Sequence, residues 1–432
     1  MSESSVAAER PLFLNQHSRL TPVHYRILFM SWAGWVFDFY DLILFTFLII
    51  PIAQEYHFSQ LQMSYVMGTT LAATAIGGVI FGILADRFGR RAILQWTILT
   101  YSAGTLLSGL AGTFWLLMIF RVITGLGVGG EWGTGQTYIG ETFPCRNRGR
   151  YCAFMQTGAP IGIALASLVG GLLAPVIGWR YCFFVSTLPA VLVFFIRRHL
   201  PESDLWLNRK ENSLPGSGFT KRGATSGIQQ FIRLFSPQTR KFFLLGLVLA
   251  IFDMSAYWLT YSWMPGYLVM ERNFSFTKSV YWILVTQTGG FLGYFLFGFV
   301  SDRIGRRPTY SIYSVIMAVG LIMVTLLWDH IVKHPPVILS CMFMVGFGTG
   351  MFGGFGSLFS EIFPTSVRNT AMGSAFNLAR GIQFLTPVAI SLIAMRYQMA
   401  GGISLAALFA LLTGAWIWTF PETKGKKLYP ED

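Results

Sequence analysis

Twelve stretches of mostly apolar residues follow one another along the chain, each about 20 residues long. A helix of that length spans the hydrocarbon core of a bilayer, so each stretch predicts one membrane-spanning helix. Only 12% of the residues are charged, which is about half the share found in soluble domains. The sequence therefore predicts an all-α membrane protein with twelve transmembrane helices. The stretches run near 28–50, 62–84, 93–111, 115–137, 151–173, 179–197, 242–265, 279–299, 309–328, 336–358, 371–394 and 401–420.

Basic residues are concentrated in alternate gaps between these stretches. If both chain ends lie in the cytoplasm, 25 of the 32 Lys and Arg residues fall in inner segments and five fall in outer gaps. This asymmetry is the positive-inside pattern. It predicts a multi-pass protein of the cell's inner membrane, with cytoplasmic tails at 1–27 and 421–432. The net charge of +13 belongs to this pattern, and we expect no nucleic-acid partner.

One long polar segment, 199–240, divides the chain into two halves, 28–198 and 241–420, and we expect it to be a cytoplasmic linker. Short motifs recur in the same order in both halves. Such repeats predict two six-helix bundles, related by pseudo-two-fold symmetry, around a central cavity. The sequence GILADRFGRR at 82–91 matches GFVSDRIGRR at 298–307, ETFP at 141–144 matches EIFP at 361–364, and PES at 201–203 matches PET at 421–423.

The sequence contains no pattern that indicates metal, cofactor or enzymatic chemistry. The four cysteines form neither a close pair nor a zinc spacing, so we expect no metal site and no disulfide. We also expect no cofactor. All the histidines fall in predicted tails or loops, which leaves carboxylates as the candidates for proton chemistry inside the membrane. These histidines are His17, His24, His57, His199, His330 and His334.

The loop motifs at 82–91 and 298–307 resemble the signature loop of the major facilitator superfamily, and the resemblance covers essentially the whole chain. It implies a transporter with that superfamily's fold. The sequences GGEWG at 129–133 and DFYD at 38–41 resemble the proton symporters of organic acids, in particular the sialate and monocarboxylate branch and its metabolite-symporter relatives. The sugar-porter branch carries a Gln-Gln pair in helix seven, and the stretch 242–265 has none.

Acidic and basic residues cluster at the expected inner ends of helices in both halves. Asp86 and Asp302 lie beside arginines, and we expect Glu141 and Glu361 to lie nearby. We predict that these clusters hold the two halves together at the cytoplasmic face and separate when the carrier opens inward. The alternative is that they anchor loops to anionic lipid headgroups, although aspartates add nothing to such binding. The predicted gating residues are Gly82, Asp86, Arg87, Gly89, Arg90, Arg91, Glu141, Arg148, Asp302, Arg303, Arg306, Glu361 and Arg368.

Several charged residues interrupt the apolar stretches, each at a cost of roughly 2.5–3.5 kcal/mol on insertion scales. We expect each to face a partner or a wet cavity, or else to form a static ion pair that orients helices. Asp38 and Asp41 are neighbours on one helix face, and two close carboxylates resist simultaneous ionisation. The resemblance implies that Arg121 faces Asp41. The predicted proton-coupling residues are Asp38, Asp41, Asp253 and Glu131, and Glu131 is equally open to a structural role.

Arg380 is the predicted anchor for an anion, because a guanidinium matches a carboxylate with two parallel hydrogen bonds. In the empty carrier we expect it to rest against Asp253 or a helix-one aspartate. A permanent tie between Arg380 and Asp253 is the alternative. For each glutamine taken singly, the alternative is that it joins two helices instead of binding substrate. The other predicted substrate-binding residues are Asn377, Gln383, Arg121, Gln287 and Gln156.

These patterns favour proton-coupled symport of a small organic anion, such as a monocarboxylate, another short-chain carboxylate or a sialate-like acid. A proton on a carboxylate would free an arginine to bind the anion. A proton-coupled sugar or polyol symporter on the same scaffold is the alternative. The expected partners are the anion, the proton and the lipid bilayer. Because one chain contains both halves, we expect it to function as a monomer.

Overall fold

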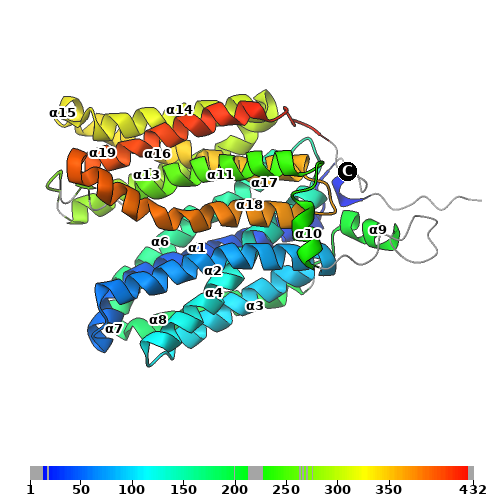
Figure 1. Ribbon diagram of the computed structural model, residues 1–432, viewed down its shortest axis with the longest axis horizontal. Helices are drawn as coiled ribbons and strands as arrows, with labels where there is room; N and C mark the ends of the chain where they lie inside the picture. The colour runs from blue at the N-terminus through cyan, green and yellow to red at the C-terminus, as the bar shows by residue number, and fades with distance from the viewer. Residues whose placement is uncertain are drawn as a thin grey trace, which may run out of the picture.

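Long helices that lie side by side make up the architecture. The computed structural model describes residues 13–16, 19–198, 200–212, 227–261, 264, 267–268, 271–274 and 276–426. These residues form helices and connecting turns, and the same residues contain no β-strand. Figure 1 shows the helices running in a common direction in two groups, with the N-terminal helices below and the C-terminal helices above. The predicted all-α architecture is confirmed.

The N-terminal half consists of six helical spans, of which the fifth is interrupted. A wide π-helical turn, Val169–Leu173, separates two parts of that span. Pro175 follows this turn at once and has no N–H to donate to it. The helices of this half are α1 (Pro22–Tyr56), α2 (Gln60–Phe88), α3 (Arg90–Gly109), α4 (Phe114–Thr142), α5 (Arg148–Gln156), α6 (Gly158–Leu168), α7 (Ala174–Ile177) and α8 (Trp179–Arg197).

The C-terminal half repeats this order. A break at Gln398, with φ 61° and ψ 179°, divides α19 into two parts. The first part continues α18 and the second forms the last span, so the described residues of this half also form six spans. Its helices are α11 (Arg240–Tyr261), α13 (Phe276–Ile304), α14 (Arg306–Thr325), α15 (Trp328–Ile331), α16 (Pro335–Gly348), η3 (Thr349–Gly353), α17 (Gly354–Ile362), α18 (Arg368–Ile382), η4 (Gln383–Leu385) and α19 (Thr386–Trp416).

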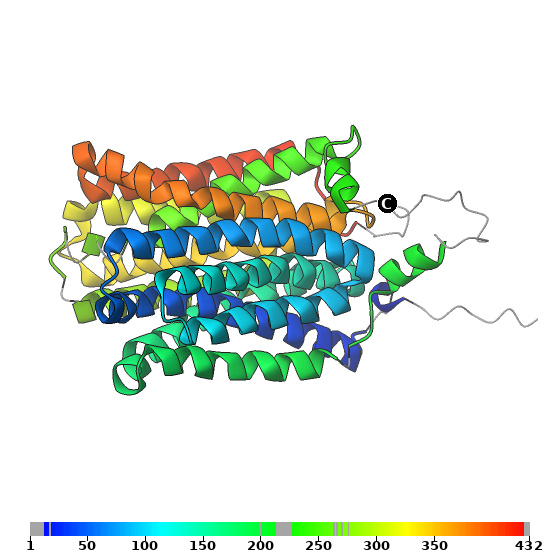
Figure 2. The ribbon, with the colours of Figure 1, turned by 60° about the horizontal axis from the view of Figure 1, so that its bottom comes forward.

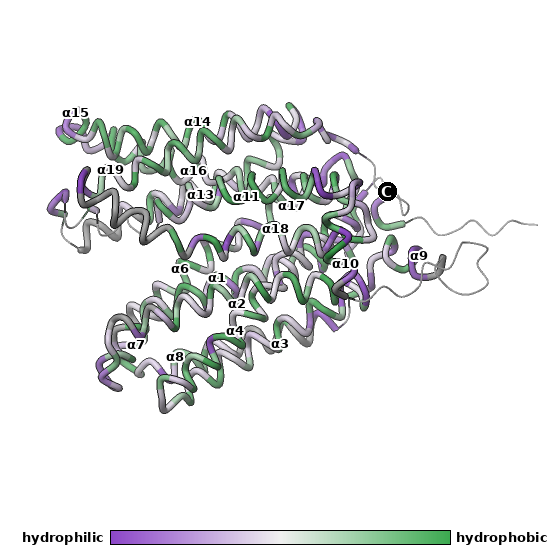
Figure 3. The backbone as a smooth tube through the Cα atoms, in the orientation of Figure 1, coloured by the Kyte–Doolittle hydropathy of each residue, from purple (hydrophilic) through white to green (hydrophobic). Residues whose placement is uncertain are grey.

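The helices have the apolar surface that a bilayer requires. Within the described part of the chain, nine helical segments are long and apolar enough to cross a membrane. Figure 3 shows apolar residues along the length of the helices and polar residues gathered near α9 and α10. The other three predicted spans, 93–111, 179–197 and 371–394, correspond to α3, α8 and the α18–α19 junction.

His24 corrects one prediction from the sequence. α1 begins at Pro22 with Thr21 as its N-cap, so His24 lies in the first helical turn rather than in a tail or loop. Its ring nitrogens contact the Thr21 hydroxyl at 2.8 Å and the Thr142 carbonyl oxygen at 3.2 Å. The ring is fully buried, and it therefore joins the start of α1 to the end of α4.

The predicted linker 199–240 contains helices where the structure describes it. These are α9 (Asp204–Asn212) and α10 (Gly227–Arg233). Trp206 of α9 donates its indole N–H to the carbonyl oxygen of Asp86 at 3.0 Å, so α9 packs against the end of α2. In Figure 2, α9 and α10 lie at one end of the long helices. His17, His199 and the tail residues 1–12 and 427–432 lie outside the described residues.

The two halves meet through a repeated pair of helix contacts. α2 packs against α18, and α13 packs against α5 in the corresponding position. Small residues allow the close approach. A Cβ atom on Gly82 would lie 3.1 Å from Thr370 Cα, and one on Gly298 would lie 2.4 Å from Arg150 Cα. The predicted pseudo-symmetry is therefore seen in the contact between the halves as well as in each half.

Gly89 and Gly305 form equivalent sharp turns, between α2 and α3 and between α13 and α14. Both have φ of +104°, a conformation that side chains with a Cβ rarely adopt. A carboxylate occupies the space beside each turn: Glu202 accepts the backbone N–H of Arg90 at 2.8 Å. Glu422 accepts the N–H of the residue after Gly305 at 2.9 Å. Each glutamate thus caps a helix N-terminus that has no cap of its own.

Gly89→Ala should destabilise the folded protein by about 1–3 kcal/mol, because a Cβ forces strain at this backbone conformation. The new Cβ would also lie 2.3 Å from Glu202 Oε2. Thermal unfolding in detergent measures the effect. Gly112→Ala is the matched control, since a Cβ added there would meet no atom within 4 Å beyond its chain neighbours, and its φ is not positive. Equal unfolding temperatures for the two variants would contradict the prediction that a Cβ at position 89 strains the backbone.

Candidate functional site

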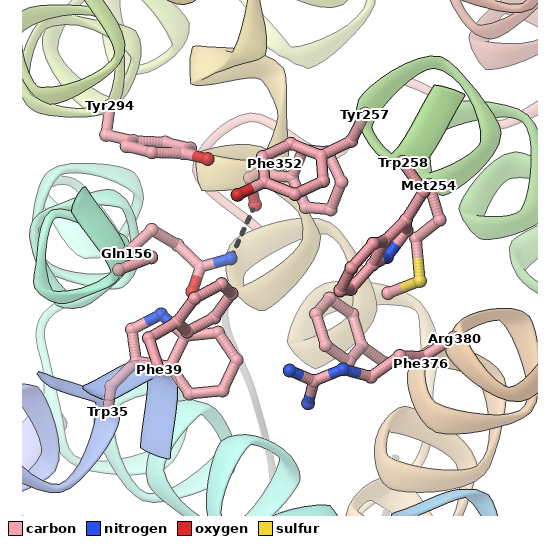
Figure 4. A pocket seen from close by; sticks show the side chains of 11 residues that line it. Trp35, Phe39, Gln156, Met254, Tyr257, Trp258, Tyr294, Phe352, Phe376 and Arg380 are labelled. Carbon is pink, nitrogen blue, oxygen red and sulfur yellow. Dashed lines mark hydrogen bonds between the residues drawn. The ribbon is translucent and has the colours of Figure 1, made fainter. Parts of the chain in front are cut away.

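A central pocket lies between the two halves, as Figure 4 shows. Its walls come from α1, α5 and α6 of the N-terminal half and from α11, α13, η3 and α18 of the C-terminal half. Aromatic rings contribute seven of the eleven lining residues. The lining consists of Trp35, Phe39, Gln156, Ala159, Met254, Tyr257, Trp258, Tyr294, Phe352, Phe376 and Arg380. This position agrees with the central cavity between the two bundles that the sequence predicts.

Arg380 is the charged member of this lining. It projects from α18, and its guanidinium carbon lies 5.5 Å from the centroid of the Phe39 ring. Neither Nη atom has a hydrogen-bond partner in the described part of the protein. Although Asp38 lies within electrostatic reach, no ion pair joins Arg380 to Asp38 or Asp253 among the described residues. The permanent tie to Asp253 considered above is therefore absent from this conformation.

Asp38 is fully buried on α1, and neither carboxylate oxygen has a hydrogen-bond partner among the described residues. Four charged neighbours act on it. Arg380 and Arg197 attract its negative charge, while Glu131 and Asp41 repel it. The repulsion from Glu131 is stronger than that from Asp41. A buried carboxylate without a direct partner is costly when ionised, so this group is suited to gaining and losing a proton.

Asp41 has a different environment from Asp38. It forms an ion pair with Arg121 at 2.9 Å and accepts a hydrogen bond from the Thr105 hydroxyl at 2.6 Å. The Arg121 guanidinium also lies 4.5 Å from the centroid of the Phe45 ring. The structure thus contains the pairing that the resemblance implied. Arg121 neutralises Asp41, which leaves Asp38 as the member of this pair without a direct partner, and Asp41 still repels a charge on Asp38.

Glu131 pairs with Arg197, a residue that the sequence reasoning missed. The shortest contact between them is 2.6 Å, and both side chains are fully buried. Arg197 also donates to the backbone carbonyls of Met30 and Leu94, and Thr97 donates to Glu131 at 2.7 Å. This closed network favours the structural role for Glu131. Arg197 ends a predicted span, and an arginine at such a position is ordinarily expected to reach the surface. The signal that could have identified it is the buried Glu131, which needs a cation as its partner.

Asp253 occupies the position in α11 that Asp38 occupies in α1. It is fully buried, and neither oxygen has a hydrogen-bond partner among the described residues. Unlike Asp38, it has no arginine within electrostatic reach in the part of the chain that the structure describes. The repeat therefore preserves the carboxylate in both halves, while its surroundings differ.

Two of the predicted polar helpers lie away from the pocket. Asn377 donates to the Gly129 carbonyl at 2.7 Å and so joins α18 to α4. Gln383 donates to the Ser255 hydroxyl at 3.3 Å and to the Ala379 carbonyl at 3.1 Å. Neither they nor Arg121 or Gln287 belong to the residues that line the pocket. In this conformation Asn377 and Gln383 join helices, and the substrate-binding role of these four residues stays a prediction.

Gln156 does line the pocket, but its amide is already engaged. Its Oε1 accepts the indole N–H of Trp132 at 3.1 Å, and its Nε2 donates to the Phe352 carbonyl at 3.2 Å (Figure 4). The Trp132 ring in turn stacks on Phe376, with centroids 3.6 Å apart. Trp132 belongs to the 129–133 motif, so this motif forms part of the aromatic support beneath the pocket.

The predicted gating residues form a cluster at the end of the bundle near α9 and α10, which we call the charged end. Arg90 bonds Glu141 at 2.9 Å and Asp86 at 3.1 Å. Arg368, from the other half, reaches the same Glu141 oxygen at 3.0 Å. Asp86 also accepts the backbone N–H and the hydroxyl of Thr370, at 2.9 and 2.7 Å. It therefore caps the N-terminal turn of α18 across the boundary between the halves.

The same arrangement recurs with the halves exchanged. Arg306 bonds Glu361 at 2.9 Å and Asp302 at 2.7 Å, and Arg148 reaches Glu361 from the other half at 3.6 Å. Asp302 accepts the backbone N–H of Arg150 at 3.1 Å, at the start of α5. Two symmetric clusters thus bridge the halves, which is the contact that a cytoplasmic latch requires.

The outer members of the cluster have weaker roles. Arg87 and Arg303 are exposed, and they join none of the ion pairs found among the described residues. Arg91 donates a hydrogen bond to the Arg198 carbonyl and its backbone N–H to Glu202 at 3.2 Å. Burial raises the pKa of Glu202, although the backbone N–H groups that it accepts and the nearby Arg90 partly offset this.

The sequence matches the model of the Major Facilitator Superfamily over residues 29–387 and 283–431. The chain belongs to this superfamily. It is 30% identical over 382 residues to the cis,cis-muconate transport protein of Acinetobacter baylyi, and the match covers 88% of this chain and 90% of that protein. It is 28% identical over 406 residues to the sialic acid transporter NanX of Escherichia coli, with coverage of 92% and 95%.

Among solved structures, the fold resembles that of the E. coli proton:xylose symporter XylE. The TM-score is 0.77 at 22% identity, and the match covers 94% of this chain and 98% of that one. The family and its transporter relatives identify the chain as a multi-pass membrane transporter. The resemblance seen in the sequence motifs is confirmed.

Asp86→Asn should loosen the charged end, because it removes one charge from a buried cluster where losing a partner costs about 3–5 kcal/mol. Cys152 is a native reporter, since it is fully buried on α5 where that helix meets α17. Its labelling by a maleimide, read by peptide mass spectrometry, should become faster. Arg87→Gln, at the next residue of α2, is the control. Unchanged labelling of Cys152 in Asp86→Asn would count against the latch.

Proposed function

We propose that this transporter moves a small organic anion together with a proton by alternating access across the cell's inner membrane. The observation that supports it most is the environment of Arg380. A guanidinium in the wall of a central pocket, with both Nη atoms unpartnered among the described residues, is prepared for an anion. Leaving it permanently unpaired would be costly in a membrane interior. The relatives named for muconate and sialic acid agree with an acidic substrate.

Asp38 is the proposed proton-binding group. It is the buried carboxylate within electrostatic reach of the pocket arginine. In the empty carrier, the charges of ionised Asp38 and Arg380 balance. When an anion arrives at Arg380, three charges occupy one site, and the balance returns when Asp38 takes up a proton. The anion and the proton therefore favour each other's binding.

The remaining buried charges stay neutralised in this scheme. Asp41 keeps Arg121, and Glu131 keeps Arg197. The loaded carrier and the empty carrier then have the same net charge, so both can change conformation at similar electrostatic cost. The charged end is proposed to face the cytoplasm and to be closed in this conformation, and one chain is proposed to be the transporting unit.

Arg380→Ala should reduce uptake to the level of protein-free liposomes, because the anion loses its charge partner. Arg380→Lys should retain little uptake, since a single ammonium cannot reproduce the planar pair of donors. Radiolabelled lactate, benzoate and sialate are the probes, each under an imposed inward proton gradient. Arg240→Ala, which changes an exposed arginine at the start of α11, is the matched control. Normal uptake of any of these acids by the Arg380→Ala variant would contradict the role of Arg380 as the anchor of the anion.

Asp38→Asn should abolish acceleration by the proton gradient while leaving anion exchange at equal pH, because asparagine mimics the protonated acid. In the unmodified protein, uptake should rise as the external pH falls, since protonation of Asp38 accompanies loading. For a monoanion, uptake should not respond to a potassium–valinomycin membrane potential, because one negative and one positive charge move together. Uptake driven by the potential would contradict this charge balance, and a second proton on Asp253 would produce that result.

A further inference from the structure

The shape and chemistry of the pocket restrict which acid it can take. This inference rests on the proposed function and makes it more specific. We propose that the substrate is a planar aromatic or conjugated monocarboxylate, bound with its carboxylate on Arg380 and its flat apolar part between aromatic side chains. Polyhydroxylated acids and sugars are the substrates that this arrangement disfavours.

The aromatic rings come from both halves and enclose the space at steep angles to one another. The Trp35 and Phe39 rings lie 4.8 Å apart at 74°, and Trp35 lies 6.2 Å from Phe376 at 64°. On the other side, Tyr257 and Phe352 lie 5.3 Å apart at 65°. Edge-to-face contacts of this kind are favourable for aromatic partners, so a flat π-system can meet ring faces and ring edges at once.

Three buried N–H-bearing atoms of the lining lack a hydrogen-bond partner in the described part of the chain. They are Trp35 Nε1 and the two Nη atoms of Arg380. Figure 4 shows the Arg380 guanidinium directed toward the rings of Phe39 and Phe376. A carboxylate, with two oxygens and about four lone pairs, can accept both Nη donors of Arg380 at once. The guanidinium by itself thus matches one carboxylate.

The one amide side chain of the described lining is not available to a hydroxyl-rich ligand. Both polar atoms of Gln156 are used, by Trp132 and by the Phe352 carbonyl. A sugar or polyhydroxy acid would depend on tyrosine hydroxyls and indole N–H groups set in aromatic rings. Each hydroxyl of the ligand that these groups leave unpaired is costly.

The same reasoning limits the charge of the substrate. Arg380 is the cation of the described lining, and Arg121 and Arg197 are occupied by Asp41 and Glu131. A second carboxylate would therefore lie against rings with no cation to neutralise it. A monoanion is the class that the charge of the pocket accepts.

Isothermal titration of the full-length protein in detergent tests the proposal directly. Benzoate should bind about tenfold more tightly than cyclohexanecarboxylate, which has the same charge and number of carbons but no flat π-system. Benzamide, which lacks the charge, phthalate, which has a second carboxylate, and gluconate, which has many hydroxyls, should each bind more weakly than benzoate. Equal binding of benzoate and cyclohexanecarboxylate, or tighter binding of gluconate or phthalate, would overturn the assignment.

Two variants separate ring chemistry from folding. Phe39→Leu should lower the ratio of benzoate to cyclohexanecarboxylate affinity toward one, because it removes a ring beside the anchor. Phe299→Leu is the matched control: Phe299 lies 4.8 Å from an arginine, Arg150, outside the pocket. The ratio is measured within each variant, so partial unfolding does not imitate the effect. An unchanged ratio in Phe39→Leu would overturn the role of the rings.

The outcomes also distinguish this inference from the proposed function. If lactate or gluconate binds in a manner that Arg380→Ala abolishes, and benzoate does not bind, the substrate class is wrong while anion transport stands. If no carboxylate binds in an Arg380-dependent manner, both fail. Benzoate binding that depends on Arg380 and Phe39 supports both.

Discussion

The ion pair between Arg197 and Glu131 lies where four helices of the N-terminal half meet, because Arg197 also reaches the backbone of α1 and α3. A charge left alone in this interior would be very costly, so these helices are held in one arrangement. Gly34 shows how little room remains: a Cβ there would lie 2.0 Å from Glu131 Oε1. The half is thereby a stable body, and α1 presents Asp38 and Trp35 from a fixed position.

Against this background, Arg380 in the pocket wall and Asp38 within its electrostatic reach are informative, because neither forms an ion pair among the described residues. Asp41 and Glu131 each have an arginine in contact, whereas Arg380 and Asp38 have no direct hydrogen-bond partner among the described residues. Charges that are paired orient helices, and charges that are unpaired leave room for ligands. The contrast separates the structural charges from those that we propose to work in the transport cycle.

The internal repeat accounts for the rest of the arrangement. Each half supplies an aspartate that caps a helix of the other half, and a glutamate that receives an arginine from it. These contacts hold the charged end together, while the aromatic pocket lies further along the helices between the same two bodies. These contacts are polar and come in matched pairs.

The sequence by itself determined the spans, their order, the repeat and the family, because apolar length and short motifs are local properties of the chain. It also indicated Arg380 and the pair of Arg121 with Asp41. Only the tertiary structure decided that Arg197 neutralises Glu131, that Asn377 and Gln383 join helices, and that Asp38 and Asp41 have separate environments. The physical reason is that a side chain's partner depends on how each helix is rotated and packed against others, which no local pattern specifies.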